Sequence, residues 1–161
     1  MAFPSRLLGL FGLAAFAVAG CAPSAAQAPN GAATGAHAAL VPLTIKTAKG
    51  VVHYHVEVAT TGDEQARGLM YRTSLPHHGG MIFPMAPARF ASFWMKNTYI
   101  PLDIIFIRPD GSIARIAANA VPENLATIDS GEPVSAVLEI IGGGAAANGI
   151  VEGDVVVWKK R

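Results

Sequence analysis

The segment Ser92–Ile107, which reads SFWMKNTYIPLDIIFI, decides the fold prediction because it is almost wholly aromatic and aliphatic. Pro101 divides it. Since a proline cannot donate a hydrogen bond within a sheet, we predict two strands, Phe93–Tyr99 and Leu102–Ile107. Successive side chains of a strand point to opposite faces, and both faces are largely apolar here. We therefore expect other parts of the chain to cover both faces.

Two charged residues, Lys96 and Asp103, interrupt this apolar segment. Burying an isolated charge costs more free energy than the stability margin of a domain, so each must be paired or lie at a wet cleft. Glu139 has the same character within the apolar stretch AVLEII. We expect Arg67 and Arg72 to be the cations that pair with Asp103 and Glu139.

The chain around this segment alternates between apolar and polar residues with a period of two, which is typical of strands. The sequence GVVHYHVEV, residues 50–58, places Val52, Tyr54, Val56 and Val58 on one face, and LTIKTA before it is the expected hairpin partner. Thr61 and Glu64 have the spacing of a capping box, which predicts a short helix near residues 62–70. With further strands expected at 113–117, 134–141 and 154–158, we predict a mainly β fold: a compact antiparallel sandwich or barrel-like domain with one short helix.

The composition of the chain excludes several classes of protein. The 161 residues are 52% apolar and 14% charged, which excludes disorder throughout and fits one domain with short appendages. Of the 12 basic residues one, Arg6, lies in a predicted signal peptide, and removing it leaves 11 basic and 11 acidic residues. A neutral chain lacks the basic surface of a nucleic-acid binder, so we expect no nucleic-acid partner.

The first 20 residues have the form of a signal peptide. The apolar run Leu7–Ala19 follows one positive charge and is too short to span a bilayer comfortably. It ends in VAGC, which resembles a bacterial lipobox. The resemblance implies cleavage after Gly20 and the attachment of lipid, such as palmitate, to Cys21. Cys21 is the only cysteine and cannot form an internal disulfide. The alternative is ordinary cleavage near residues 26–28, which would release a free protein.

Residues 21–39 are rich in Ala, Pro and Gly and carry no charge, which predicts a flexible tether. Residues 40–161 then form a single β-rich domain. The resemblance to lipoproteins, with Ala22 rather than an aspartate after the cysteine, implies an outer-membrane protein that faces the periplasm. We expect the protein to associate with the membrane through the lipid on Cys21.

Several blocks occur in an order that resembles one protein family. They are RGLMYR, GGMIF, FWMKNTYIPLDIIFI, DGSI and VLEIIGG, between Arg67 and Gly143. The chain is similar, over about Thr44–Trp158, to the family called domain of unknown function 192. The resemblance implies a compact, mainly β domain, often exported, with no established reaction. The pairs His53/His55 and His77/His78 are not part of that pattern.

The buried charges allow two interpretations. They could form ion pairs that clamp the helix and loops onto the sheet, or they could form the polar floor of a pocket for a small polar or anionic ligand. In the second interpretation Arg67 and Lys96 donate hydrogen bonds and Asn97 orients the ligand. The candidate polar residues are Arg67, Arg72, Lys96, Asn97, Asp103 and Glu139, and the candidate lining residues are Met70, Met81, Trp94, Met95 and Tyr99.

Metal binding is a weaker hypothesis. His53 and His55 lie two residues apart on one strand face, a spacing that could chelate a metal if Glu57 or His77 supplied a third ligand. Such a pair is more often the solvated face of a strand. Methionine thioethers can bind Cu(I), but core filling is the favoured explanation for the methionines of this chain. We expect no cofactor.

These observations lead to three hypotheses for function. The first is a lipid-anchored envelope protein whose β domain binds a small polar or anionic ligand or an envelope partner. The second is an enzyme that acts on envelope glycans or related polar substrates through Asp103, Glu139 and Arg67. The third is a metal-binding module that uses His53 and His55.

Overall fold

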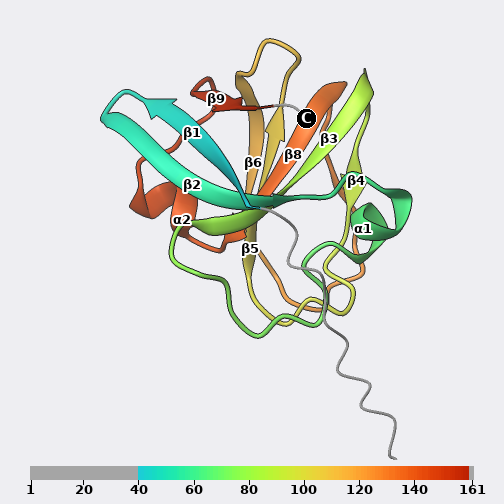
Figure 1. Ribbon diagram of the computed structural model, residues 1–161. Helices are drawn as coiled ribbons and strands as arrows, with labels where there is room; N and C mark the ends of the chain where they lie inside the picture. The colour runs from blue at the N-terminus through green and yellow to red at the C-terminus, as the bar shows by residue number, and fades with distance from the viewer. Residues whose placement is uncertain (1–39, 160–161) are drawn as a thin grey trace, which may run out of the picture. The chain divides into compact units, whose positions relative to one another are not determined.

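The computed structural model describes residues 40–159, which form one folded unit (Figure 1). Cys21, the predicted signal peptide and the predicted tether lie outside the described residues. No helix within 40–159 is long and apolar enough to cross a membrane.

The described residues form nine strands and two short helices. The strands are β1 (Val41–Thr47), β2 (Gly50–Val58), β3 (Gly79–Arg89), β4 (Ser92–Phe93), β5 (Leu102–Ile107), β6 (Ile113–Ala120), β7 (Ile128–Asp129), β8 (Val134–Ile141) and β9 (Val155–Trp158). The helices are α1 (Gly62–Arg67) and α2 (Gly144–Ala147). The predicted mainly β fold is confirmed, and α2 is a helix that the sequence patterns did not indicate.

Seven strands form one sheet in the order β6-β5-β8-β3-β2-β1-β9, and β4 pairs with β7 in a second, small sheet. The large sheet is mixed, because β2 and β3 run parallel while its other neighbours are antiparallel. A parallel pair needs a crossover connection, and α1 with the loop after it supplies one here. Ser112, the residue before β6, forms an isolated bridge with Val155 of β9, and the sheet does not close into a barrel.

Local signals in the first third of the domain are confirmed. The segments at 43–48 and 50–58 form the β1–β2 hairpin, in which Leu43 lies opposite Tyr54. Thr61 caps α1 by accepting a hydrogen bond from the Glu64 amide, and the Glu64 carboxylate accepts one from the Thr61 amide. The helix ends at Arg67, three residues before the predicted end.

The first half of SFWMKNTYIPLDIIFI departs from the prediction. Only Ser92 and Phe93 form a strand, and residues 94–100 turn back on themselves, with the Thr98 amide donating to the Met95 carbonyl. Asn97 has a φ of 54°, a left-handed conformation that asparagine tolerates and that ends strand geometry. The second half is confirmed, because all six residues of β5 are buried.

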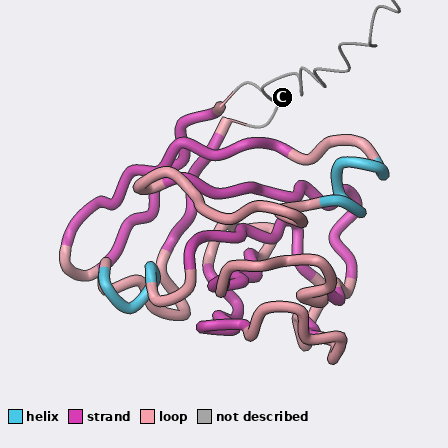
Figure 2. The backbone as a smooth tube through the Cα atoms, turned by 90° about the horizontal axis from the view of Figure 1, so that it is seen from below, coloured by secondary structure: helices cyan, strands magenta, loops and turns pink. Residues whose placement is uncertain are grey.

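Both faces of the large sheet carry a hydrophobic core, as the apolar pattern of β5 predicted. One core contains Ile105 and Ile107, which pack against residues of other strands of the large sheet and against Ala145 of α2. The other contains Ile104 and Phe106 and lies under the chain that surrounds α1, β4 and β7. Figure 2 shows loops gathered on one side of the long strands. Loops, together with α1 and the small β4–β7 sheet, therefore cover the second face.

Candidate functional site

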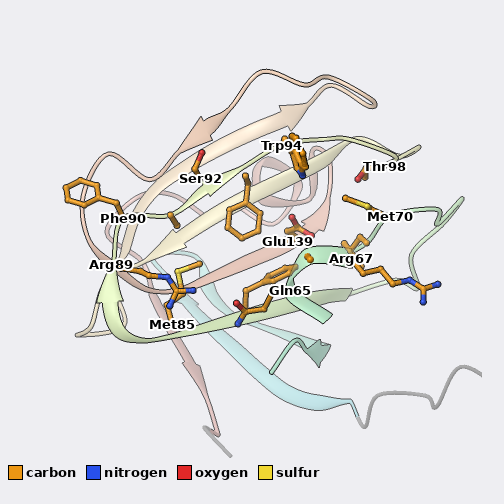
Figure 3. A pocket seen from close by; sticks show the side chains of 16 residues that line it. Gln65, Arg67, Met70, Met85, Arg89, Phe90, Ser92, Trp94, Thr98 and Glu139 are labelled. Atoms are coloured by element: carbon orange, nitrogen blue, oxygen red, sulfur yellow. The ribbon is translucent and has the colours of Figure 1, made fainter. Parts of the chain in front are cut away.

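A pocket of about 330 Å³ lies on this second face (Figure 3). Its wall is made by α1 and the turn after it, by the second half of β3 and the chain up to Trp94, and by Glu139 of β8. The lining residues are Gln65, Ala66, Arg67, Gly68, Leu69, Met70, Phe83, Met85, Arg89, Phe90, Ala91, Ser92, Phe93, Trp94, Thr98 and Glu139.

Glu139 is the buried polar group of this pocket. It sits at the centre of the large sheet, paired with Met81 of β3 on one side and Ile104 of β5 on the other, and is only 5% exposed. Burial raises its pKa to about 8, against an opposing effect of the Arg72 charge. No hydrogen bond or ion pair from residues 40–159 reaches its carboxyl group. A carboxyl group in this state is protonated at neutral pH and can donate a hydrogen bond to a ligand.

The turn after α1 leaves space above this carboxyl group. Gly68 ends the helix with a φ of 47°, a conformation that favours glycine. A Cβ atom at Gly68 would lie 3.3 Å from Cζ of Phe83 and 3.7 Å from Oε2 of Glu139. The absence of a side chain at this position therefore keeps the pocket open above the Glu139 carboxyl group.

Aromatic rings form the apolar part of the wall. Phe83 and Phe93 pack edge to face with their centroids 5.2 Å apart, and Phe93 packs in the same way on Phe106. Such edge-to-face pairs hold the rings in fixed orientations. Trp94 completes this side and is 47% exposed, so one part of it remains accessible to a ligand or to water.

Two arginines border the pocket. Figure 3 shows the Arg67 guanidinium pointing away from Glu139, whereas Arg89 lies beside Met85 at the other end. Neither guanidinium has a hydrogen-bond or ion-pair partner within residues 40–159. The expected pairing of Arg67 with Asp103 or Glu139 is therefore absent. Arg89 was not identified from the sequence, although it is the only charged residue of the Pro-rich segment Pro84–Arg89.

Asp103 lies apart from the pocket and makes no ion pair with Arg67 or Arg72. Its Oδ1 accepts hydrogen bonds from the backbone amides of Asn119 (2.8 Å) and Gly143 (3.0 Å), and its Oδ2 accepts one from Ala145 (2.8 Å). Three amide donors replace the expected cation. Asp103 thereby fixes the loop that starts α2, and the enzyme hypothesis loses one of its two carboxyl groups.

The other predicted polar residues have partners elsewhere. Arg72 forms a bidentate ion pair with Glu57, with an Nη1–Oε1 distance of 2.5 Å and an Nη2–Oε2 distance of 2.8 Å. Asn97 donates to the Tyr71 hydroxyl at 2.8 Å. Lys96 is exposed rather than buried, and its Nζ lies 5.1 Å from the centroid of the Trp94 ring. This contact places Lys96 next to a lining residue without making it part of the pocket wall.

The predicted lining residues divide in the same way. Met70 and Trp94 line the pocket. Met81 and Met95 are buried in the core beneath it, where methionine fills irregular space. Tyr99 is exposed and packs edge to face against Tyr71.

The metal hypotheses receive no third ligand from the described residues. His53 and His55 are exposed on β2, and Glu57 is engaged by Arg72. Residues 40–159 contain no group of three His, Cys, Asp or Glu side chains that could hold a metal ion. His77 stacks on His78 with ring centroids 4.1 Å apart.

Comparisons with known proteins extend these observations. The family DUF192, described as "Uncharacterized ACR", matches residues 43–158. A protein of unknown function from Novosphingobium aromaticivorans has a crystal structure that is 49% identical in sequence, with a TM-score of 0.72 over 74% of this chain and 85% of that one. A proposed transcription regulator from Sinorhizobium meliloti is 40% identical, with a TM-score of 0.72 over 74% of this chain and 94% of that one. Comparison with curated proteins gives no match.

Proposed function

The chain belongs to the uncharacterized DUF192 family, and we propose that it binds a small organic anion in the pocket above Glu139. The observation that carries this proposal is the Glu139 carboxyl group, which is buried, reaches a pocket and has no hydrogen-bond partner within 40–159. Because this carboxyl group opens onto the pocket, an acceptor of a bound ligand can accept its hydrogen bond there.

The chemistry of the pocket selects the ligand class. With a pKa of about 8, Glu139 is a hydrogen-bond donor at neutral pH, so the ligand must offer an acceptor such as a carboxylate oxygen. Arg89 supplies a positive charge, and a guanidinium matches a carboxylate geometrically. Phe83, Phe93 and Trp94 suit an apolar or aromatic body.

Benzoate is a suitable probe because it combines a carboxylate with an aromatic ring. We expect it to change the tryptophan fluorescence of the purified protein at pH 6, and we expect its affinity to fall as the pH rises through about 8. Glu139→Gln keeps a neutral donor, so it should bind benzoate with little dependence on pH. Glu139→Leu removes the donor and should weaken binding by about tenfold or more.

Two arginine variants provide a matched control. Arg89→Met should weaken benzoate binding, whereas Arg115→Met, which removes an exposed guanidinium that does not line the pocket, should leave it almost unchanged. Equal binding by wild type, Glu139→Leu and Arg89→Met would refute the proposal.

We also propose that the domain works in the bacterial envelope, anchored by lipid on Cys21. The support is the apolar run Leu7–Ala19 followed by a single cysteine, a pattern typical of exported lipoproteins. Cys21→Ser should move the protein from the membrane fraction to the soluble fraction, whereas Ala22→Ser should not. A Cys21→Ser protein that stays in the membrane fraction would contradict the anchor.

A further inference from the structure

Three loops meet outside the pocket: the turn after α1, the turn at residues 94–100 and the loop after β6. The Tyr71 amide donates to the Asn97 carbonyl at 2.8 Å, and the Glu123 amide donates to the Thr98 carbonyl at 3.1 Å. Tyr71, Asn97 and Glu123 all have positive φ, at 64°, 54° and 57°. Residues other than glycine rarely adopt this conformation, and it persists where surrounding contacts enforce it, often at binding sites.

Two tyrosine rings are exposed on this fixed backbone. Tyr71 is 55% exposed and Tyr99 is 47% exposed, and the two rings pack edge to face with their centroids 6.1 Å apart. The contact orients each ring against the other and leaves about half of each side chain open to solvent. Because the rings are already ordered, a ligand that stacks on them loses little free energy to side-chain ordering.

The polar atoms beside the rings offer one donor and one acceptor. Asn97 Nδ2 donates to the Tyr71 hydroxyl oxygen at 2.8 Å and lies 3.9 Å from Met70 Sδ, which uses both of its hydrogens. The hydroxyl hydrogen of Tyr71 and the Oδ1 atom of Asn97 have no partner within residues 40–159. A ligand group that carries both an acceptor and a donor, such as an acetamido group, complements this pair.

The charge and size of this surface select the class of ligand. The exposed side chains of Lys96 and Glu123 carry opposite charges, which favours a neutral ligand over an anion. A stable protein interface takes about 800 Å² from each partner, far more than two half-exposed tyrosines supply. A sugar ring is about as large as one aromatic ring, with an apolar face of C–H groups and polar groups at its edge. It therefore suits an exposed tyrosine with hydrogen-bonding neighbours.

We propose that Tyr71, Asn97 and Tyr99 bind a saccharide that carries acetamido groups. The apolar face of one sugar ring lies on the tyrosine rings, and an acetamido group accepts a hydrogen bond from the Tyr71 hydroxyl and donates one to Asn97 Oδ1. None of these three residues lines the pocket above Glu139, so this site is a second one, separate from the proposed anion site.

Two sugars that differ only in the acetamido groups test the proposal. Chitotetraose, a β-linked tetramer of N-acetylglucosamine, and cellotetraose, the glucose tetramer with the same linkage, are titrated into the purified full chain by isothermal titration calorimetry. Chitotetraose should bind, and cellotetraose should bind at least about fivefold more weakly, the factor expected for one lost hydrogen bond. Equal binding of the two sugars, or no binding of chitotetraose, would overturn the proposal.

Variants of the two tyrosines separate stacking from hydrogen bonding. Tyr99→Leu keeps an apolar side chain but removes the aromatic face, so it should weaken the binding of both sugars by about tenfold. Tyr71→Phe keeps the ring and removes only the hydroxyl group. It should weaken chitotetraose binding by about fivefold and thereby reduce the preference over cellotetraose. Chitotetraose binding that neither variant weakens would place the sugar elsewhere.

Two asparagines provide a matched control for the backbone. Asn97→Gly removes the side-chain amide but keeps a residue that tolerates positive φ, so it should weaken chitotetraose binding as Tyr71→Phe does. Asn119→Gly makes the same change at another left-handed asparagine, with a φ of 49°, that makes no hydrogen bond with Tyr71. It should bind chitotetraose as wild type does. Equal losses in both variants would show that the Asn97 side chain is not a ligand.

Glu139→Leu distinguishes this site from the anion pocket. The variant should lose benzoate affinity and keep chitotetraose affinity, because Glu139 is not part of the tyrosine surface. Loss of chitotetraose binding in Glu139→Leu would show that the sugar occupies the pocket, and the present proposal would then be wrong. Failure of benzoate to bind would refute the anion pocket alone and leave the saccharide site standing on its own titrations.

Discussion

Asp103 and Glu139 are two buried carboxyl groups on adjacent strands, and their surroundings are opposite. Asp103 lies opposite Ile140 and Glu139 lies opposite Ile104 in the same β5–β8 ladder, so their side chains point to different faces of the sheet. On one face Asp103 accepts three backbone amide hydrogen bonds. On the other face Glu139 has no such donor among residues 40–159 and reaches a pocket instead.

The comparison shows that burial alone does not define the role of a carboxyl group. Asp103 holds a loop in place, because amide donors replace the water that it lost. Glu139 has no such amide donors among residues 40–159, and its burial raises its pKa to about 8. Satisfied hydrogen bonds indicate a structural role for Asp103, and their absence beside a cavity is the basis of the binding role that we propose for Glu139.

The largest expected effect comes from removing the structural carboxylate. Asp103→Ala leaves three buried amide donors without an acceptor, at roughly 1 kcal/mol or more each, so the free energy of unfolding should fall by at least about 3 kcal/mol. Urea unfolding measures this change. Asp103→Asn keeps one oxygen acceptor and should lose less. A loss below about 1 kcal/mol for Asp103→Ala would show that the Gly143 loop does not depend on this carboxylate.

The next effect concerns the pH dependence of stability. The folded-state pKa of Glu139, about 8, exceeds its ordinary value of 4.5, so the folded protein holds a proton that the unfolded chain releases. The contribution of Glu139 to stability is therefore complete below about pH 4.5 and is lost as the pH rises through about 8. The slope attributable to this group is at most about 1.4 kcal/mol per pH unit between these values.

Urea unfolding at several pH values checks this slope in wild type and in Glu139→Gln. The glutamine variant cannot ionise, so its stability should change less between pH 5 and pH 8, and it should exceed wild type in stability at the upper end. An unchanged slope in Glu139→Gln would mean that Glu139 is ionised in the folded protein and would remove the basis for its role as a donor.

The sequence predicted features that depend on neighbouring residues. The alternation in residues 50–58, the Thr61–Glu64 capping box and the apolar β5 each reflect a contact within a few residues or a face that the pattern itself reveals. All three are confirmed in the structure. The second half of β3 and the turn at 94–100 were not predicted, because left-handed Asn97 and the β8 pairing depend on distant parts of the chain.

The candidate site was predicted only in part for the same reason. Glu139 and Met70 were identified because a charge or a methionine in an apolar block is visible in the sequence, and both line the pocket. Asp103 is likewise a charged residue in an apolar block. Its structural role, however, depends on backbone amides up to 42 residues away in the sequence, those of Asn119, Gly143 and Ala145. Arg89 gave no signal, because an arginine in a Pro-rich segment looks like ordinary surface in the sequence.

The smallest expected effect is the contribution of the Arg72 charge to the pKa of Glu139. The Arg72 charge opposes the effect of burial on the Glu139 pKa. Arg72→Gln should therefore raise the pKa of Glu139 further. Glu57→Gln breaks the same ion pair, with a comparable small loss of stability, but it keeps the cation and should not raise that pKa. The ¹³C shift of the Glu139 carboxyl group, followed by NMR against pH, reports the pKa directly. An equal upward displacement in both variants would show that the ion pair acts by positioning the turn after α1, and that the Arg72 charge itself does not act on Glu139.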